Sequence, residues 1–183
     1  MTTAVFNLPK ALNALLYLAD KANNKDMMSL FKLLFFSEME HLNVWGRSIT
    51  GDRYIAMENG PVPSCLYDIV KAVRGDGYYR TDGEKFKKYF IVERWMFVTP
   101  KRQADTDELS MSEIKIFDQM IDKYRDYTPE QLSKASHGYA WSNTLRDHAI
   151  SIEDIMKEFG AEQEYIDYVT GNVKTQKMLH AMA

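Results

Sequence analysis

The pair of side chains best suited to metal chemistry is Glu38 and His41, which stand three residues apart in a stretch of helical periodicity. This spacing places both on one face of a helix, as in half of the motif that di-iron helix bundles use. The full motif needs a second Glu-x-x-His pair, and none of the other histidines has an acidic residue three positions before it. We therefore interpret His41 as a histidine that lies on the helix surface or forms hydrogen bonds, and predict no metal site.

The single cysteine, Cys65, is the one candidate for a nucleophile. It falls in the first turn of a predicted helix, where the helix dipole could lower the pKa of its thiol, and it could pair with His41 or His137. However, the sequence has no thiol-protease signature, phosphate-binding loop, dinucleotide fingerprint, Gly-x-Ser-x-Gly elbow or Cys-x-x-Cys pair. We expect no catalytic residues and no cofactor, and an enzyme that uses Cys65 or a histidine-bound metal stays the competing class.

Length and composition predict one domain over residues 1–183, because 45% of the residues are hydrophobic and can fill a core. A lone cysteine is typical of a reducing compartment, and no signal peptide or long apolar run is readable. The net charge of −3 is spread along the chain without a basic cluster. We therefore expect a cytoplasmic protein that binds neither a membrane nor nucleic acid.

A long helix that begins after Asp26 is predicted at the centre of the fold. Its apolar residues fall on more than one stripe, which is typical of a helix covered on several sides, and the pattern ends near Trp45–Gly46. Asn7 is suited to cap a helix before it. Lys32 stands mid-helix among apolar neighbours, where a charge is costly unless it is paired.

A strand, a rigid elbow and a third helix follow. Tyr54–Met57 favours an extended strand, and Asn59–Gly60 predicts a bend because glycine takes positive φ without steric cost. Pro61 and Pro63 lack backbone donors, and Val62 is held extended by the proline after it. Pro63 can then open the helix.

The rest of the chain predicts one more β-hairpin and several helices. Phe86–Thr99 contains two short strands that turn near Glu93, and capping patterns at Ser110, Thr128 and Ser151 begin three helices. A last helix follows from about residue 161 and is expected to break at Gly171. The predicted fold is α+β and mainly helical, with about six helices around a central helix and a small antiparallel β-sheet or hairpin.

Two blocks of residues resemble a known family. The first contains Lys32-Leu-Leu-Phe-Phe, Gly46-Arg47, Thr50-Gly51, Tyr54 with Ala56, and Gly60-Pro61-Val62-Pro63 followed by Leu66-Tyr67. The second contains Leu132-Ser133, His137 and Trp141. Taken in this order, they resemble the Panacea domain, the SocA-like or GepA-like phage-associated family, over about residues 10–160.

This resemblance implies a cytoplasmic antitoxin that neutralises a co-encoded protein toxin by direct contact. In related systems an antitoxin delivers its toxin to an ATP-dependent protease, so a proteolytic adaptor is the alternative within this class. Some members carry a separate DNA-binding domain, for which the residues before Asn7 leave no room, so a DNA-binding repressor is a less expected alternative. The resemblance supplies no catalytic residues and does not identify which matching residues touch a toxin.

The motif residues with polar atoms could act together. We predict that Lys32, Tyr54, His137 and Trp141 form one buried network that supports the toxin-facing surface. Gly60, Pro61, Val62 and Pro63 would set the shape of the backbone beside it. The segment 171–183 is expected either to dock on the body or to stay mobile.

Overall fold

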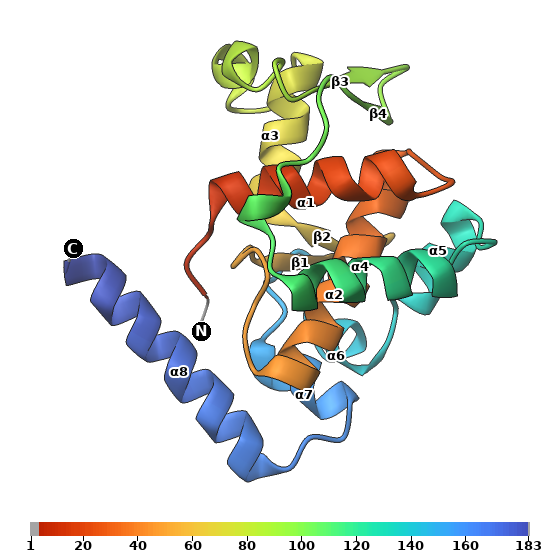
Figure 1. The fold of residues 1–183 in the computed structure, drawn as a ribbon. Coiled ribbons are helices and arrows are strands. Elements are labelled where there is room, and N and C mark those ends of the chain that lie inside the picture. Colours follow the sequence, from red (N-terminus) through yellow and green to blue (C-terminus); the bar gives the residue numbers. More distant parts are fainter. Residues whose placement is uncertain (1–3, 183) are drawn as a thin grey trace.

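Helix α2 (Met27–Trp45) runs through the middle of the fold, and most other elements pack around it (Figure 1). The computed structural model describes residues 4–182. Asp26 caps α2 by accepting a hydrogen bond from the Ser29 N–H at 3.0 Å, and Gly46 ends it in the left-handed region. All residues from Leu30 to Met39 are buried, so the predicted central helix is confirmed.

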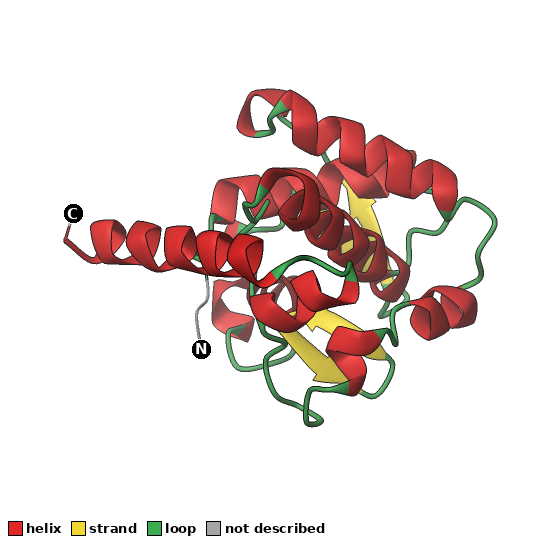
Figure 2. Cartoon of the chain, turned by 90° about the horizontal axis from the view of Figure 1, so that it is seen from below, coloured by secondary structure: helices red, strands yellow, loops and turns green. Residues whose placement is uncertain are grey.

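The described chain is mainly helical with two separate two-stranded antiparallel sheets, which lie apart in Figure 2. The predicted α+β class is therefore confirmed. The helices besides α2 are α1 (Leu8–Lys21), α3 (Ser64–Arg74), α4 (Met111–Lys123), α5 (Pro129–Ala135), α6 (Tyr139–Ser142), α7 (Ile152–Glu158) and α8 (Gln163–Met182), with 3-10 helices at Arg80–Lys85 and Thr106–Glu108. The strands are β1 (Tyr54–Met57), β2 (Gly60–Pro63), β3 (Phe90–Glu93) and β4 (Phe97–Pro100).

Two hydrophobic clusters form the core, and α2 contributes to both. Its first half, from Leu30 to Leu34, packs with α1, α3 and the β3–β4 hairpin. Its second half, from Phe35 to Leu42, packs with β1, α4, α7 and the start of α8. None of the helices in residues 4–182 is both long and apolar enough to cross a membrane.

The predicted elbow at Gly60–Pro63 is in fact strand β2, which pairs antiparallel with β1. Prolines are tolerated there because of the register. The Ala56 N–H donates to the His148 carbonyl on the other side of β1, and Pro61 lies opposite Ala56. Since hydrogen-bonded and non-hydrogen-bonded pairs alternate along an antiparallel ladder, Pro61 is not required to donate to β1.

Helix α3 begins with a cap that lies far away in sequence. The Asp52 carboxylate accepts hydrogen bonds from the N–H groups of Cys65 and Leu66, both at 2.9 Å. Gly75 ends the helix at φ +95°, as its position predicts. The predicted hairpin in residues 86–99 is confirmed as β3 and β4, although the strands begin only at Phe90.

The C-terminal helices follow most of the predicted signals. The capping boxes at Ser110 and Thr128 and the cap at Ser151 are all present. The predicted break at Gly171 is wrong, because α8 is continuous from Gln163 to Met182. A glycine inside a helix costs about 1 kcal/mol relative to alanine and does not by itself end the helix. Figure 1 shows the second half of α8 leaving the body, and most of its residues are exposed.

Gly60 is the one position in the β1–β2 turn where a side chain cannot be accommodated. Its φ of +93° is in the left-handed region, and an added Cβ would lie 2.3 Å from Ser136 Oγ and 3.1 Å from Lys32 Nζ. Close contact and backbone conformation therefore both require glycine.

We predict that Gly60→Ala lowers the free energy of unfolding by roughly 2–4 kcal/mol, because it adds a steric clash to backbone strain. The matched control is Gly75→Ala, since Gly75 has φ +95° and open space around it. In the control, only the strain of a left-handed backbone should lower the free energy of unfolding, by about 1–2 kcal/mol. Urea unfolding of both variants measures the difference, and equal losses would contradict close packing at Gly60.

Candidate functional site

The buried amine of Lys32 is the centre of the site. Its side chain extends from α2 to β2 and is 1% exposed, and Nζ donates a hydrogen bond to the Pro61 carbonyl at 2.8 Å. Within residues 4–182 no carboxylate lies within ion-pair distance of this amine. Burial lowers the pKa of Lys32 to about 7, because desolvation disfavours the charged form.

His137 stands in the turn between α5 and α6, beside this amine. Its ring stacks on Trp141 with 3.8 Å between the ring centroids and 18° between the planes. Its Nε2 atom is buried and has no hydrogen-bond partner in the part of the chain that the structure describes. Burial first, and then the charge of Lys32, lowers the pKa of His137.

Two hydrogen bonds attach this turn to the β1–β2 hairpin. Trp141 Nε1 donates to the Met57 carbonyl at 2.9 Å, and Ser133 Oγ donates to the Asn59 carbonyl at 2.9 Å. The helix α6, which carries Trp141, has only four residues and is too short to present an apolar face. We therefore attribute its position to these contacts.

A hollow of about 420 Å³ opens between α2, the hairpin and α5. Lys32 and His137 both line it, and Glu130 and Lys134 of α5 add one negative and one positive side chain. The remaining lining residues are Met28, Asn59, Pro129 and Ser133. The hollow therefore combines two nitrogen atoms that are largely removed from water with a mixed charged rim.

The predicted network of Lys32, Tyr54, His137 and Trp141 is wrong in part. Lys32, His137 and Trp141 come together near the hairpin turn, but Tyr54 lies opposite Pro63 at the open end of the hairpin. Its ring packs against a phenylalanine of α2, and its hydroxyl is buried without a partner in residues 4–182. No hydrogen bond between described residues joins any two of the four predicted members, since their bonds go to backbone carbonyls.

The motif residues of β2 act through the backbone and the core. Gly60 allows the close approach of the α5–α6 turn, and Pro61 provides the carbonyl that Lys32 binds. Val62 is buried in the first core cluster, and Pro63 is the last residue before α3. These four residues shape the wall behind the hollow and do not line it.

Two further residues position the site and could not be found from sequence. Ser136 is buried, donates to the Ser133 carbonyl at 2.7 Å and presses on Gly60. Glu158 of α7 accepts a hydrogen bond from the Ala140 N–H at 2.8 Å. Neither role has a local sequence signal, because Ser136 is an ordinary small residue and Glu158 lies eighteen positions after the Ala140 N–H that it binds.

Glu38 and His41 are engaged in holding the loop after α2. The Glu38 carboxylate accepts hydrogen bonds from the N–H groups of Ile49 and Thr50, and burial raises the pKa of Glu38 to about 7. His41 Nδ1 lies 2.7 Å from the Arg47 carbonyl, to which it must donate, and Nε2 lies 3.1 Å from Ser112 Oγ. Of the two predicted alternatives for His41, the structure shows the hydrogen-bonded one, since the residue is buried and does not lie on the helix surface.

The Cys65 thiol is not activated. Burial, and then the nearby Asp52 carboxylate, raise its pKa to about 11. The prediction that the helix dipole could lower this pKa is therefore wrong. The physical reasons are that burial disfavours the thiolate and that the Asp52 carboxylate, which caps the helix N-terminus, places a negative charge beside the sulfur.

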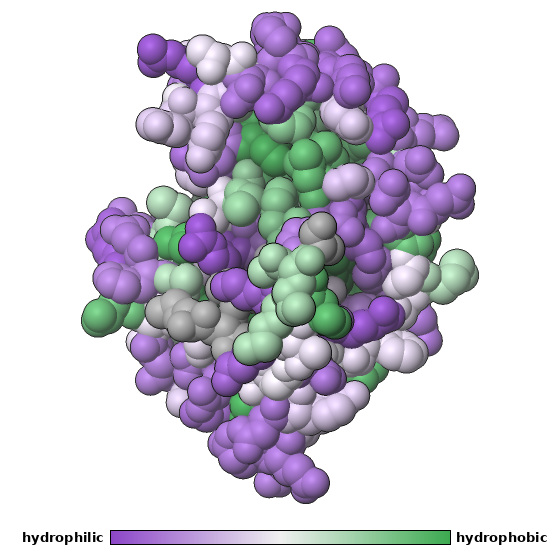
Figure 3. Space-filling view, turned by 90° about the vertical axis from the view of Figure 1, so that its left-hand side faces the viewer, coloured by the Kyte–Doolittle hydropathy of each residue, from purple (hydrophilic) through white to green (hydrophobic). Residues whose placement is uncertain are grey.

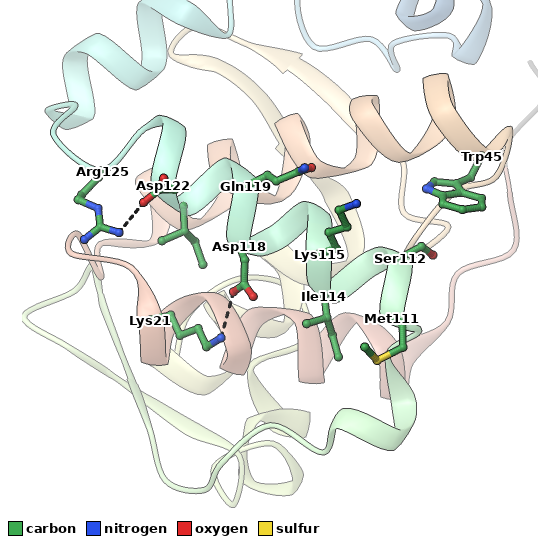
Figure 4. A pocket seen from close by; sticks show the side chains of 11 residues that line it. Lys21, Trp45, Met111, Ser112, Ile114, Lys115, Asp118, Gln119, Asp122 and Arg125 are labelled. Atoms are coloured by element: carbon green, nitrogen blue, oxygen red, sulfur yellow. Dashed lines mark hydrogen bonds and ion pairs between the residues drawn. The ribbon is translucent and has the colours of Figure 1, made fainter.

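A larger hollow, of about 1,060 Å³, is an open groove along α4 (Figure 4). Four of its charged residues form the ion pairs Lys21–Asp118 and Arg125–Asp122, and Trp45 and Met111 are exposed at one end. Another hollow, of about 380 Å³, lies beside α3, where Figure 3 shows an apolar floor between hydrophilic rims. Neither hollow is lined by a residue of the predicted site.

The chain matches the family model described as "Antitoxin SocA-like, Panacea domain" over residues 30–142. This range is more than half of the chain, and the protein therefore belongs to this family. It extends from α2 to α6 and includes Lys32, the β1–β2 hairpin, His137 and Trp141. No curated protein and no solved structure matches the chain significantly.

We predict that stability rises with pH above 7 because of Lys32. Its pKa falls from 10.5 in the unfolded chain to about 7 in the fold, so the unfolded chain binds more protons between these values and folding is favoured as pH rises. Between pH 7 and pH 10, the free energy of unfolding of wild type should rise by roughly 2–4 kcal/mol relative to that of Lys32→Met.

Urea unfolding at pH 7, 8.5 and 10 measures this difference. Lys174→Met is the matched control, because Lys174 is exposed on α8 and its removal should leave the pH profile unchanged. A difference between wild type and Lys32→Met that stays constant with pH would contradict a neutral buried amine.

Proposed function

We propose that the protein is a cytoplasmic antitoxin that neutralises a co-encoded protein toxin by binding it directly. The family of the chain supports this proposal. The observation that carries it beyond the family name is that Lys32 and His137, from two distant segments, line one hollow on the surface, with Trp141 stacked on the His137 ring. His137 lines this hollow, and its buried Nε2 has no partner among residues 4–182, so its hydrogen-bonding capacity is available to a ligand.

The other chemical groups of the chain favour binding over catalysis. The Cys65 thiol is protonated at neutral pH because its pKa is raised to about 11. Glu38 and His41 already bind the loop after α2 and the first turn of α4. The net charge of −3 also disfavours nucleic acid as a partner.

The proposed contact surface is centred on the hollow and extends over α5 and α6. A stable protein interface covers about 800 Å² on each partner, so the hollow alone is too small. Tyr139 of α6 is exposed, and tyrosine is enriched at interfaces. The aromatic stack of His137 on Trp141 would form its rigid part.

The test is growth rescue with the protein encoded beside this one. Expression of that neighbour alone should arrest a bacterial host, and co-expression of this chain should restore growth. The two proteins should co-purify through a tag on either, with the toxin still abundant. Rescue with loss of the toxin would instead show proteolytic delivery, and absence of both toxicity and complex would overturn the proposal.

We predict that His137→Ala and Trp141→Ala abolish rescue and co-purification while the protein stays folded. His137→Ala removes the stacked ring at the rim of the hollow, and Trp141→Ala removes its support. The matched controls are His148→Ala and Trp45→Ala, because both residues are exposed and lie away from the hollow.

Circular dichroism and thermal unfolding verify the fold of each variant. If the control variants rescue growth fully and the folded site variants do not, the result supports toxin binding at the surface around His137 and Trp141. If His137→Ala and Trp141→Ala unfold at the assay temperature, the two residues are structural. If they fold and rescue as wild type does, the toxin binds elsewhere.

A further inference from the structure

We propose that the hollow beside Lys32 binds a single carboxylate group presented by the toxin, with Lys32 Nζ and His137 Nε2 as its two donors. This inference rests on the proposed function, because it names the chemical group that the antitoxin surface recognises. Its evidence lies in the unused hydrogen-bonding capacity of these two atoms.

The Lys32 amine has more donors than partners. An ammonium carries three N–H groups, and the described residues provide one acceptor, the Pro61 carbonyl. The charged form of a group this deeply buried is costly unless an opposite charge meets it, which is why burial lowers its pKa in the free protein. A carboxylate that enters the hollow would supply this charge, and the amine would gain a charge-assisted hydrogen bond.

His137 supplies the second donor. Its Nε2 is removed from water and has no partner in residues 4–182, although the residue lines the same hollow as Lys32. Its stack on Trp141 fixes the plane of the ring, and Trp141 is held in turn by the Met57 carbonyl. A ring fixed in this way loses little further freedom when it donates to a ligand.

The charges that face the hollow favour a monoanion. Lys32 and Lys134 are the cations, Glu130 is the anion, and His137 can gain a proton. With Lys32 protonated and His137 neutral, these side chains sum to one positive charge, which one carboxylate neutralises. A phosphate dianion or a nucleic-acid backbone would add a second negative charge close to Glu130. An aspartate, a glutamate or a chain terminus of the toxin therefore fits best.

Binding of a carboxylate should be coupled to proton uptake. A negative charge beside Lys32 and His137 favours their protonated forms, and both pKa values are lowered in the free protein. Affinity should therefore fall as pH rises above 7. Glu130 and Lys134, the other titratable groups facing the hollow, both lie on its exposed rim.

The first experiment needs no toxin. The ring signals of His137 in the full chain are followed by NMR while acetate is added, with acetamide as the neutral isostere and chloride as the ionic-strength control. We expect a saturable shift with acetate alone, weaker at pH 9 than at pH 6.5. The same shift should be absent in Lys32→Met. An acetate response equal to that of chloride would overturn the proposal.

The second experiment places the carboxylate on the toxin. Each exposed Asp and Glu of the toxin is changed to Asn or Gln, and affinities are measured against wild type, Lys32→Met and His137→Phe. His137→Phe keeps the aromatic stack and removes Nε2. One toxin substitution should weaken binding to wild type at least about tenfold. The same substitution should leave the affinity for Lys32→Met and for His137→Phe unchanged.

The two hypotheses fail separately. If wild type binds the toxin and no acidic residue couples to Lys32 or His137 in this cycle, direct neutralisation stands and carboxylate recognition is wrong. If no toxin is bound but acetate is, the hollow recognises carboxylates for another purpose and the proposed function is wrong. Folding of Lys32→Met and His137→Phe is verified by circular dichroism before either reading.

Discussion

The hydrogen bond from the Lys32 amine to the Pro61 carbonyl is the interaction on which the rest of the site depends. It brings the central helix and the β1–β2 hairpin into contact at a point where both are buried. The hairpin then approaches so closely that only glycine fits at position 60. Because the α5–α6 turn packs on that glycine through Ser136, the position of His137 also follows from this one contact.

A buried amine is an unusual means of joining a helix to a hairpin. A methionine of similar length would fill the same space without desolvating a charge, and replacing buried ions by apolar groups is often neutral or stabilising. The fold thus retains a group that stability alone does not require. This observation agrees with a role in recognition, since binding sites commonly keep polar groups that the folded chain leaves incompletely satisfied.

Local sequence signals predicted the parts of the fold that depend on local physics. The caps at Asp26, Ser110 and Thr128 are present because a side-chain oxygen needs only a backbone N–H three residues away. The contacts that form the site are long-range. No pattern could show that Asp52 caps α3, or that Tyr54 does not line the hollow, because both depend on how the hairpin docks.

The participation of α2 in both core clusters has a consequence for how the molecule opens. Two clusters built on separate elements could open one at a time, as independent cooperative units. Here a single continuous helix supplies the wall of each cluster, so neither can expose its interior without disturbing the packing of the other. The amide protons of α2 should consequently exchange with solvent only in global unfolding, and the two halves of the molecule should melt in one transition.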